Sequence, residues 1–89
     1  MKRHYNITVR GRVQGVGFRY NARRQAMTLG LDGFVKNMPD GSVYMEVEGN
    51  QVDLDEFVYW CHTGPSYSRV LDVIVSISNL EGFTGFNAY

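Results

Sequence analysis

Apolar and polar residues alternate along three segments of the chain, and this period of two predicts strands with one buried face. The three segments are residues 5–10, 43–48 and 73–77. A shorter stretch at 33–37 predicts another strand, and residues 83–89 are expected to form a short last one. The alternation therefore indicates a sheet that packs one face on a core.

Two further segments carry apolar residues every three or four positions, which is typical of amphipathic helices. In the first helix these residues are Phe18, Ala22, Ala26 and Leu29. In the second they are Leu54, Phe57, Val58 and Cys61. Gly30 stands where a helix C-cap is expected, Asn50 is expected to cap the second helix, and Gly64-Pro65 ends it.

The turn signal Met38-Pro39-Asp40-Gly41 joins two of the predicted strands into a hairpin. The resulting order is βαββαβ, with a possible extra strand at the C-terminus. This order predicts an α+β fold, the ferredoxin-like sandwich, in which both helices pack on one face of an antiparallel sheet. The 89 residues are expected to form a single domain, residues 1–89.

Composition excludes several classes of protein. No apolar run approaches the roughly 20 residues that a membrane helix needs, and the N-terminus has no apolar core of a signal peptide. The single cysteine, Cys61, cannot form an intramolecular disulfide, so a cytoplasmic protein is expected. His4 and His62 lie far apart in the sequence, and no Cys/His spacing predicts a metal site.

Charge is unevenly distributed although the net charge is zero. Residues 1–36 hold eight basic residues against one acidic residue, and residues 37–89 hold one against eight. Either the first part attracts an anion, or the two parts pair with each other across the fold.

The segment GRVQGVGFR, residues 11–19, lies between the first predicted strand and the first predicted helix. Unpaired N–H groups at the start of a helix favour an anion, and glycine lets the backbone wrap closely around it. Arg19 adds a planar guanidinium that matches two phosphate oxygens. The segment therefore predicts a phosphate cradle, and the alternative is a sharp connection that needs glycine for geometry alone.

Three segments resemble the acylphosphatase family. They are GRVQGVGFR, the later LGLDGFVKNMPDGSVYMEVEG and the WCHTGPSYSRV junction, and the likeness covers nearly the whole chain in order. The resemblance implies the ferredoxin-like fold and a small hydrolase of the carboxyl–phosphate bond that uses no metal, cofactor or covalent intermediate. It also implies a monomer whose only partners are a small acyl phosphate and inorganic phosphate or sulfate as product or inhibitor, with no nucleic acid or membrane.

The resemblance also implies roles for individual residues. Arg19 is expected to bind the phosphoryl group and Asn37 to orient the attacking water. The residues expected to line the phosphate loop are Gln14, Gly15, Val16, Gly17 and Phe18. Without the family, Asn37 would be interpreted as a turn-flanking asparagine.

The predicted site lacks an obvious general acid or base, and an acyl phosphate tolerates this absence. Its leaving group departs as a carboxylate, whose ordinary pKa is about 4, so no proton need be delivered. An alkyl phosphate ester would leave as an alkoxide and would need an acid or a metal. The missing acid therefore favours an acyl phosphate over an ordinary ester.

Two departures from the family pattern stand out. Phe34 occupies a position where tryptophan is usual, and Ala88 one where arginine is common.

Two alternatives to an enzyme remain to be considered. The first is an RNA-binding module, but the sequence contains no RNP1-like run. The second is a regulatory domain of a larger maturation protein, and the short chain argues against it.

Overall fold

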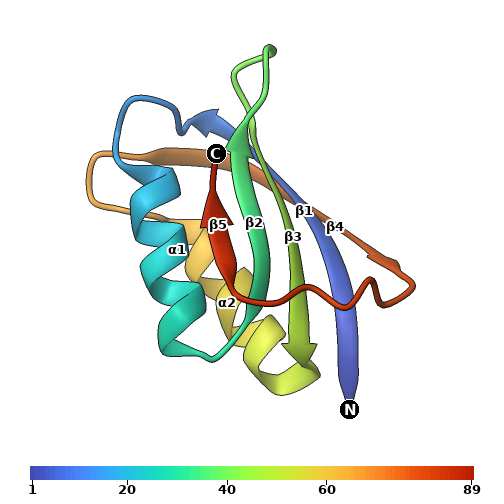
Figure 1. Cartoon of the computed structure of the whole chain (residues 1–89). Coiled ribbons are helices and arrows are strands. Elements are labelled where there is room, and N and C mark those ends of the chain that lie inside the picture. The colour runs from blue at the N-terminus through green and yellow to red at the C-terminus, as the bar shows by residue number, and fades with distance from the viewer.

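The computed structural model describes all 89 residues, and its helices and strands follow the predicted order βαββαβ with one added strand (Figure 1). The elements are β1 (Lys2–Arg12), α1 (Phe18–Thr28), β2 (Asp32–Asn37), β3 (Val43–Asn50), α2 (Gln51–Thr63), β4 (Arg69–Ser78) and β5 (Phe86–Ala88). The strand β1 extends beyond the alternating segment 5–10 at both ends because it is hydrogen-bonded to β3 on one side and β4 on the other.

The five strands form one sheet in the order β4-β1-β3-β2-β5. The pairs β4–β1, β1–β3 and β3–β2 are all antiparallel, as predicted. The short β5 pairs in parallel with β2, so the complete sheet is mixed. Three residues without a clear alternation carry little information about the direction of pairing, which is why the sequence indicated the strand but not its orientation.

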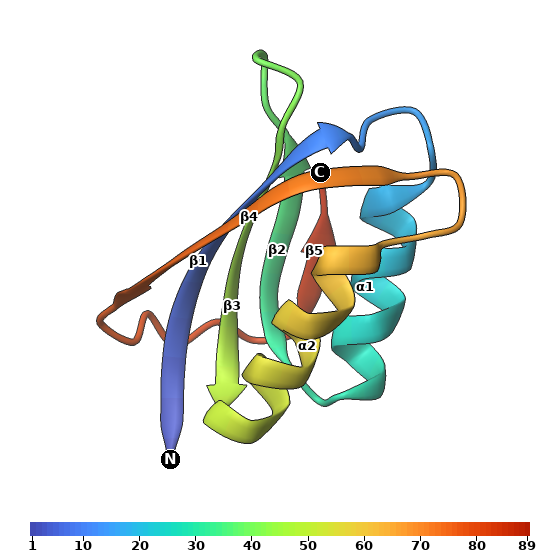
Figure 2. The same cartoon turned by 180° about the vertical axis from the view of Figure 1, so that it is seen from behind.

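Both helices cover the same face of the sheet, and the opposite face carries no helix (Figures 1 and 2). Alternate residues of the strands point toward the helices, and cross-strand neighbours such as Ile7 and Met45 meet there. The buried apolar cluster consists of Tyr5, Ile7, Val9, Val13, Phe18, Ala22, Ala26, Leu31, Val35, Val43, Met45, Val47, Leu54, Phe57, Cys61 and Phe86. Every apolar residue named for helical spacing belongs to this cluster or packs against it.

The ends of the helices agree with the sequence prediction in one case and differ in another. Gly30 follows α1 with a φ of 71° and donates its N–H to the carbonyl of Met27, which is the expected glycine ending. Asn50 does precede α2, but its side chain makes no capping hydrogen bond. The N–H of Gln51 instead donates to the carbonyl of Met1, so the N-terminal strand satisfies this donor of the helix.

The segment 79–85 between β4 and β5 runs across the helix-free face of the sheet (Figures 1 and 2). It buries two polar side chains of that face, His4 on β1 and Glu48 on β3. Although His4 is close to the N-terminus, its side chain is only 1% exposed. The sequence did not reveal this burial because a segment more than 70 residues away produces it.

Candidate anion-binding and catalytic site

The topology brings four chain segments to one edge of the sheet. Strands β1 and β2 are both antiparallel to β3 and therefore run in the same direction, and β5 is parallel to β2. The carboxyl ends of all three strands consequently lie at one edge, and α1 starts there after the loop that follows β1. Residues far apart in the sequence, such as Val13 and Tyr89, can therefore meet at this edge, although β3 lies between β1 and β2.

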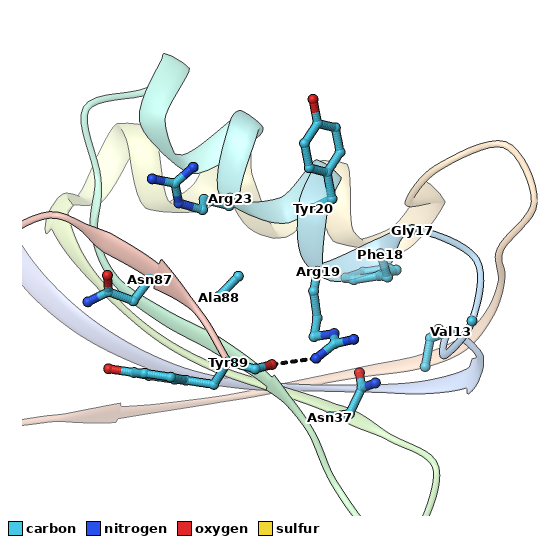
Figure 3. A pocket seen from close by; sticks show the side chains of 11 residues that line it. Val13, Gly17, Phe18, Arg19, Tyr20, Arg23, Asn37, Asn87, Ala88 and Tyr89 are labelled. Atoms are coloured by element: carbon cyan, nitrogen blue, oxygen red, sulfur yellow. Dashed lines mark hydrogen bonds between the residues drawn. The ribbon is translucent and has the colours of Figure 1, made fainter.

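An open cleft of about 580 Å³ lies at this edge (Figure 3). Its lining residues are Val13, Gly15, Gly17, Phe18, Arg19, Tyr20, Arg23, Asn37, Asn87, Ala88 and Tyr89. Two arginines line the cleft and no aspartate or glutamate does. The side chains around it therefore favour an anionic ligand.

The loop between β1 and α1 has the backbone geometry that glycine makes accessible. Gly15 has a φ of 73° and Gly17, the N-cap residue of α1, a φ of 80°. Other residues would be strained in this left-handed region. The positive φ values turn the chain sharply from the strand into the helix, and the helix begins at Phe18 directly beside the cleft.

The main-chain N–H groups of this loop have no acceptor within the chain. None of residues 14–20 donates a backbone hydrogen bond, and no side chain caps the first turn of α1. The Asn21 side chain bonds the carbonyl of Gly17 rather than an N–H group. With no acidic residue in the first turn, the positive end of the helix dipole is not neutralised by a carboxylate.

Arg19 and Asn37 lie in the same cleft (Figure 3). Arg19 comes from the first turn of α1, and its Nη1 donates to the main-chain oxygen of Tyr89 just after β5. Asn37 is the last residue of β2, pairs with Val43 across the hairpin and is half-buried. Their common location had rested on the family resemblance alone, and the sheet order supplies its physical reason.

The remaining loop residues lie in different surroundings. The Gln14 side chain points away to the hairpin turn, where its Nε2 donates to the carbonyls of Met38 and Ser42 at 2.8 and 2.9 Å. Val16 packs against the core and does not line the cleft. Phe18 lines it, but its ring is almost fully buried and lies 5.4 Å from that of Trp60. Only the main chain of Gln14 and Val16 is thus available to a ligand.

Several cleft residues were not identified from the sequence, notably Tyr20, Arg23, Asn87 and Tyr89. For Arg23 a signal existed, because it follows Arg19 by four positions on a predicted helix and therefore shares its face. The residues on β5 carried no such signal, since their place in the cleft depends on the parallel pairing of β5 with β2.

The basic and acidic parts of the chain do not neutralise each other through ion pairs. The ion pairs of the structure join His4 to Glu46 and to Glu48, and no lysine or arginine pairs with a carboxylate side chain. Direct ion pairs of arginine or lysine therefore do not explain the uneven charge, although Arg10 lies opposite Asp72 on the neighbouring strand. The arginines of the first part remain available to an anion.

Two further features bear on the expected chemistry. No group of three or more His, Cys, Asp or Glu side chains is arranged so that it could hold a metal ion. Neither helix is long and apolar enough to cross a membrane.

The fold and the cleft together define a small α+β protein with a cationic cleft where a glycine loop enters a helix. Comparison with known proteins specifies this class further. The sequence profile of the acylphosphatase family matches residues 5–88. The chain is 48% identical over 81 residues to an acylphosphatase of Trichormus variabilis, covering 91% of this chain and 80% of that protein.

Solved structures give the same result. The crystal structure of an acylphosphatase from Bacillus subtilis matches with a TM-score of 0.95 and 42% identity, over 100% of this chain and 99% of that one. An acylphosphatase from Coxiella burnetii matches with a TM-score of 0.96 and 31% identity, over 99% and 93%. The chain belongs to the acylphosphatase family.

Proposed function

We propose that this protein is an acylphosphatase that hydrolyses the carboxyl–phosphate bond of small acyl phosphates without a metal or cofactor. The observation that carries the proposal is one cleft that combines unpaired loop N–H groups, the Arg19 guanidinium and the Asn37 amide, and that has no carboxylate side chain in its lining. Membership of the family supports the same activity.

The main chain of Gln14, Gly15, Val16, Gly17 and Phe18, together with Arg19, binds the phosphoryl group in this proposal. The N–H groups donate to its oxygens, and the guanidinium adds two parallel donors and a positive charge. Tyr89 holds the guanidinium through its main-chain oxygen, so the arginine is oriented before substrate binds. Each charge-assisted hydrogen bond contributes roughly 1.5–3 kcal/mol.

Asn37 orients the water that attacks phosphorus. The water oxygen forms a new bond to phosphorus while the bond from phosphorus to the acyl oxygen breaks, and the electron pair leaves with the carboxylate. The proton of the water passes to a phosphoryl oxygen, so no general base is required. Phosphoryl transfer of this kind depends on positioning and on neutralisation of spread charge, which the cleft supplies.

The proposal extends to the setting in which the enzyme acts. We propose that residues 1–89 act as one domain, because a single buried apolar cluster joins both helices to the sheet, and that the protein acts as a monomer in the cytoplasm. Inorganic phosphate, as product, and sulfate, as its analogue, are expected to inhibit by occupying the loop. Nucleic acid and membranes are not expected partners.

The test compares two aromatic substrates with the same phosphoryl group. Wild-type protein in EDTA is expected to release phosphate from benzoyl phosphate, whose leaving group is a carboxylate, and not from phenyl phosphate, whose leaving group is a far more basic phenolate. Addition of magnesium should leave the rate unchanged. Equal turnover of both substrates, or turnover of benzoyl phosphate only with metal, would overturn the proposal.

A further inference from the structure

A second guanidinium lines the cleft beyond the one assigned to the phosphoryl group. Arg23 lies one turn further along α1 than Arg19, and both residues line the cleft. In Figure 3 the Arg19 side chain points toward Asn37 and Tyr89, and the Arg23 side chain extends in a different direction. A separation of four residues places their Cα atoms about 6 Å apart along the helix axis. The cleft therefore offers cations at two points rather than one.

The Arg23 guanidinium is held by its inner nitrogen and is free at its outer ones. Its Nε donates to the main-chain oxygen of Phe86 on β5 at 2.9 Å. No carboxylate pairs with it, since both ion pairs of the structure involve His4. A hydrogen bond at Nε alone fixes the plane of the group and leaves the two terminal nitrogens as a fork for a ligand.

The cleft continues from Arg19 toward Arg23 past Ala88, whose side chain is a single methyl group (Figure 3). A larger side chain at this position of β5 would stand between the two arginines. Asn87 adds a neutral amide to the lining, and no acidic side chain does. An acyl group that extends past Ala88 from a phosphoryl group bound at Arg19 would meet Arg23 as the only other charged side chain of the lining.

We propose that Arg23 determines substrate specificity by binding a second anionic group on the acyl part of the substrate. The preferred substrates are then acyl phosphates that carry a distal carboxylate or phosphate a few atoms beyond the carbonyl carbon. This inference rests on the proposed acylphosphatase function and adds the chemical class of its acyl group. Arg23 takes no part in bond breaking and acts on binding of the substrate and its transition state alike.

The test uses acyl phosphates matched in length. Succinyl phosphate carries a distal carboxylate, 3-phosphonopropionyl phosphate a distal phosphonate, and butyryl phosphate an uncharged methyl group. Wild-type protein is expected to hydrolyse at least one anionic substrate with kcat/KM about tenfold above that for butyryl phosphate, mostly through KM, the effect expected of one charge-assisted hydrogen bond at an open site. The relative rates of the two anionic substrates show which group the pocket prefers.

Three variants separate a specific contact from general charge. Arg23→Gln is expected to bring the ratio of anionic to neutral substrate close to one, and Arg23→Lys to retain part of it. Arg24→Gln removes the same charge from the adjacent position, which is exposed, lies over the Tyr20 ring and does not line the cleft, so it should keep the wild-type ratio. Circular dichroism and thermal melting check that loss of the bond to Phe86 has not unfolded β5.

The outcomes distinguish this inference from the proposed function. If wild-type protein turns over butyryl phosphate as well as both anionic substrates, or if Arg24→Gln lowers the ratio as much as Arg23→Gln, the role of Arg23 is refuted while the enzyme remains an acylphosphatase. If no acyl phosphate is hydrolysed, the proposed function fails and this inference fails with it.

Discussion

Two polar regions of this molecule differ in how their hydrogen-bonding groups are satisfied. At the cleft, the N–H groups of residues 14–20 have no acceptor in the chain, and Arg19 is exposed. On the helix-free face, His4 and Glu48 are buried and every one of their polar atoms has a partner. Groups left open toward solvent are available to a ligand, whereas groups satisfied within the fold stabilise it.

His4 and Glu48 form hydrogen bonds with all of their side-chain polar atoms. Glu48 accepts the N–H groups of Glu81, Gly82 and Phe83 and a bond from His4 Nδ1 at 2.8 Å. The other ring nitrogen of His4 contacts Glu46 at 3.0 Å. These bonds attach segment 79–85 to the sheet, and β5, which contributes to the cleft, follows that segment. The buried network of His4 and Glu48 therefore helps to hold β5 in place beside the cleft.

Removal of Arg19 should have the largest effect on the cleft. Arg19→Ala is expected to lower kcat/KM for benzoyl phosphate by about 10³-fold, because the cation that neutralises the transferring phosphoryl group is lost. Circular dichroism should show an unchanged fold. Arg24→Ala, which removes an exposed charge five residues further along α1, serves as the matched control. Unchanged kcat/KM in Arg19→Ala would remove this residue from the mechanism.

Asn37 should affect the rate more than binding. Asn37→Ala is expected to lower kcat by about 10²-fold, since the attacking water loses its orientation. The inhibition constant of inorganic phosphate should change little, because the loop and Arg19 remain. Asn50→Ala is a suitable control, as its side chain makes no capping bond. Equal losses in kcat and in phosphate affinity would make Asn37 a binding residue instead.

On the helix-free face, substitutions are expected to lower stability and to leave activity nearly unchanged. Glu48→Gln should lower the free energy of unfolding by about 2 kcal/mol, because an amide group replaces one of the oxygens that accept from segment 79–85. Urea denaturation measures this, and kcat of the folded fraction should stay within about twofold of wild type. Glu81→Gln keeps its main-chain N–H and changes only an exposed side chain, so it should be neutral. Equal destabilisation by both changes would contradict the buried network.

The shifted pKa values of His4 and Glu48 predict how stability depends on pH. Burial by itself raises the pKa of Glu48, but the N–H groups of segment 79–85 and His4 outweigh it and lower this pKa to about 2. Burial lowers the pKa of His4, yet its bonds to Glu48, Asn6 and Glu46 outweigh burial and raise this pKa above its ordinary value of 6.5.

The direction of each pKa shift determines whether its contribution to stability is lost at low or at high pH. The Glu48 contribution is complete above the ordinary value of 4.5 and is lost as the pH falls toward 2. The His4 contribution is complete below 6.5 and is lost as the pH rises through the raised pKa. The free energy of unfolding should therefore be highest between about pH 4.5 and 6.5 and decline above it, and His4→Gln should abolish the decline above pH 6.5. A decline that persists in His4→Gln would assign it to other groups.

Much of the fold follows from local patterns, because strand alternation and helical spacing record which face each residue buries. Residues such as Ile7, Met45 and Phe57 were placed in the core correctly for this reason. The pairing of β5 and the burial of His4 could not be predicted, since both depend on the path of segment 79–85 across the sheet. Asn50 is the N-cap residue of α2, as predicted, but its side chain makes no capping hydrogen bond.

In the candidate site, too, some features follow from the local sequence and others depend on the tertiary fold. The glycine loop and Arg19 are adjacent in the sequence, so their chemistry could be predicted from spacing. The approach of Asn37 and Tyr89 depends on the order of strands across the sheet, whereas Arg23 follows Arg19 on the same helix. The Gln14 side chain could not have been assigned, since only the structure shows that it bonds the hairpin turn.

The most direct test of the account is a titration of ¹⁵N-labelled protein with inorganic phosphate, followed by NMR. We expect the largest amide shifts at residues 14–20, small shifts at residues 81–83 whose N–H groups already bond Glu48, and loss of saturable shifts in Arg19→Ala. Shifts spread evenly over the chain, or loop amides unaffected by millimolar phosphate, would contradict the claim that this loop and Arg19 bind the phosphoryl group.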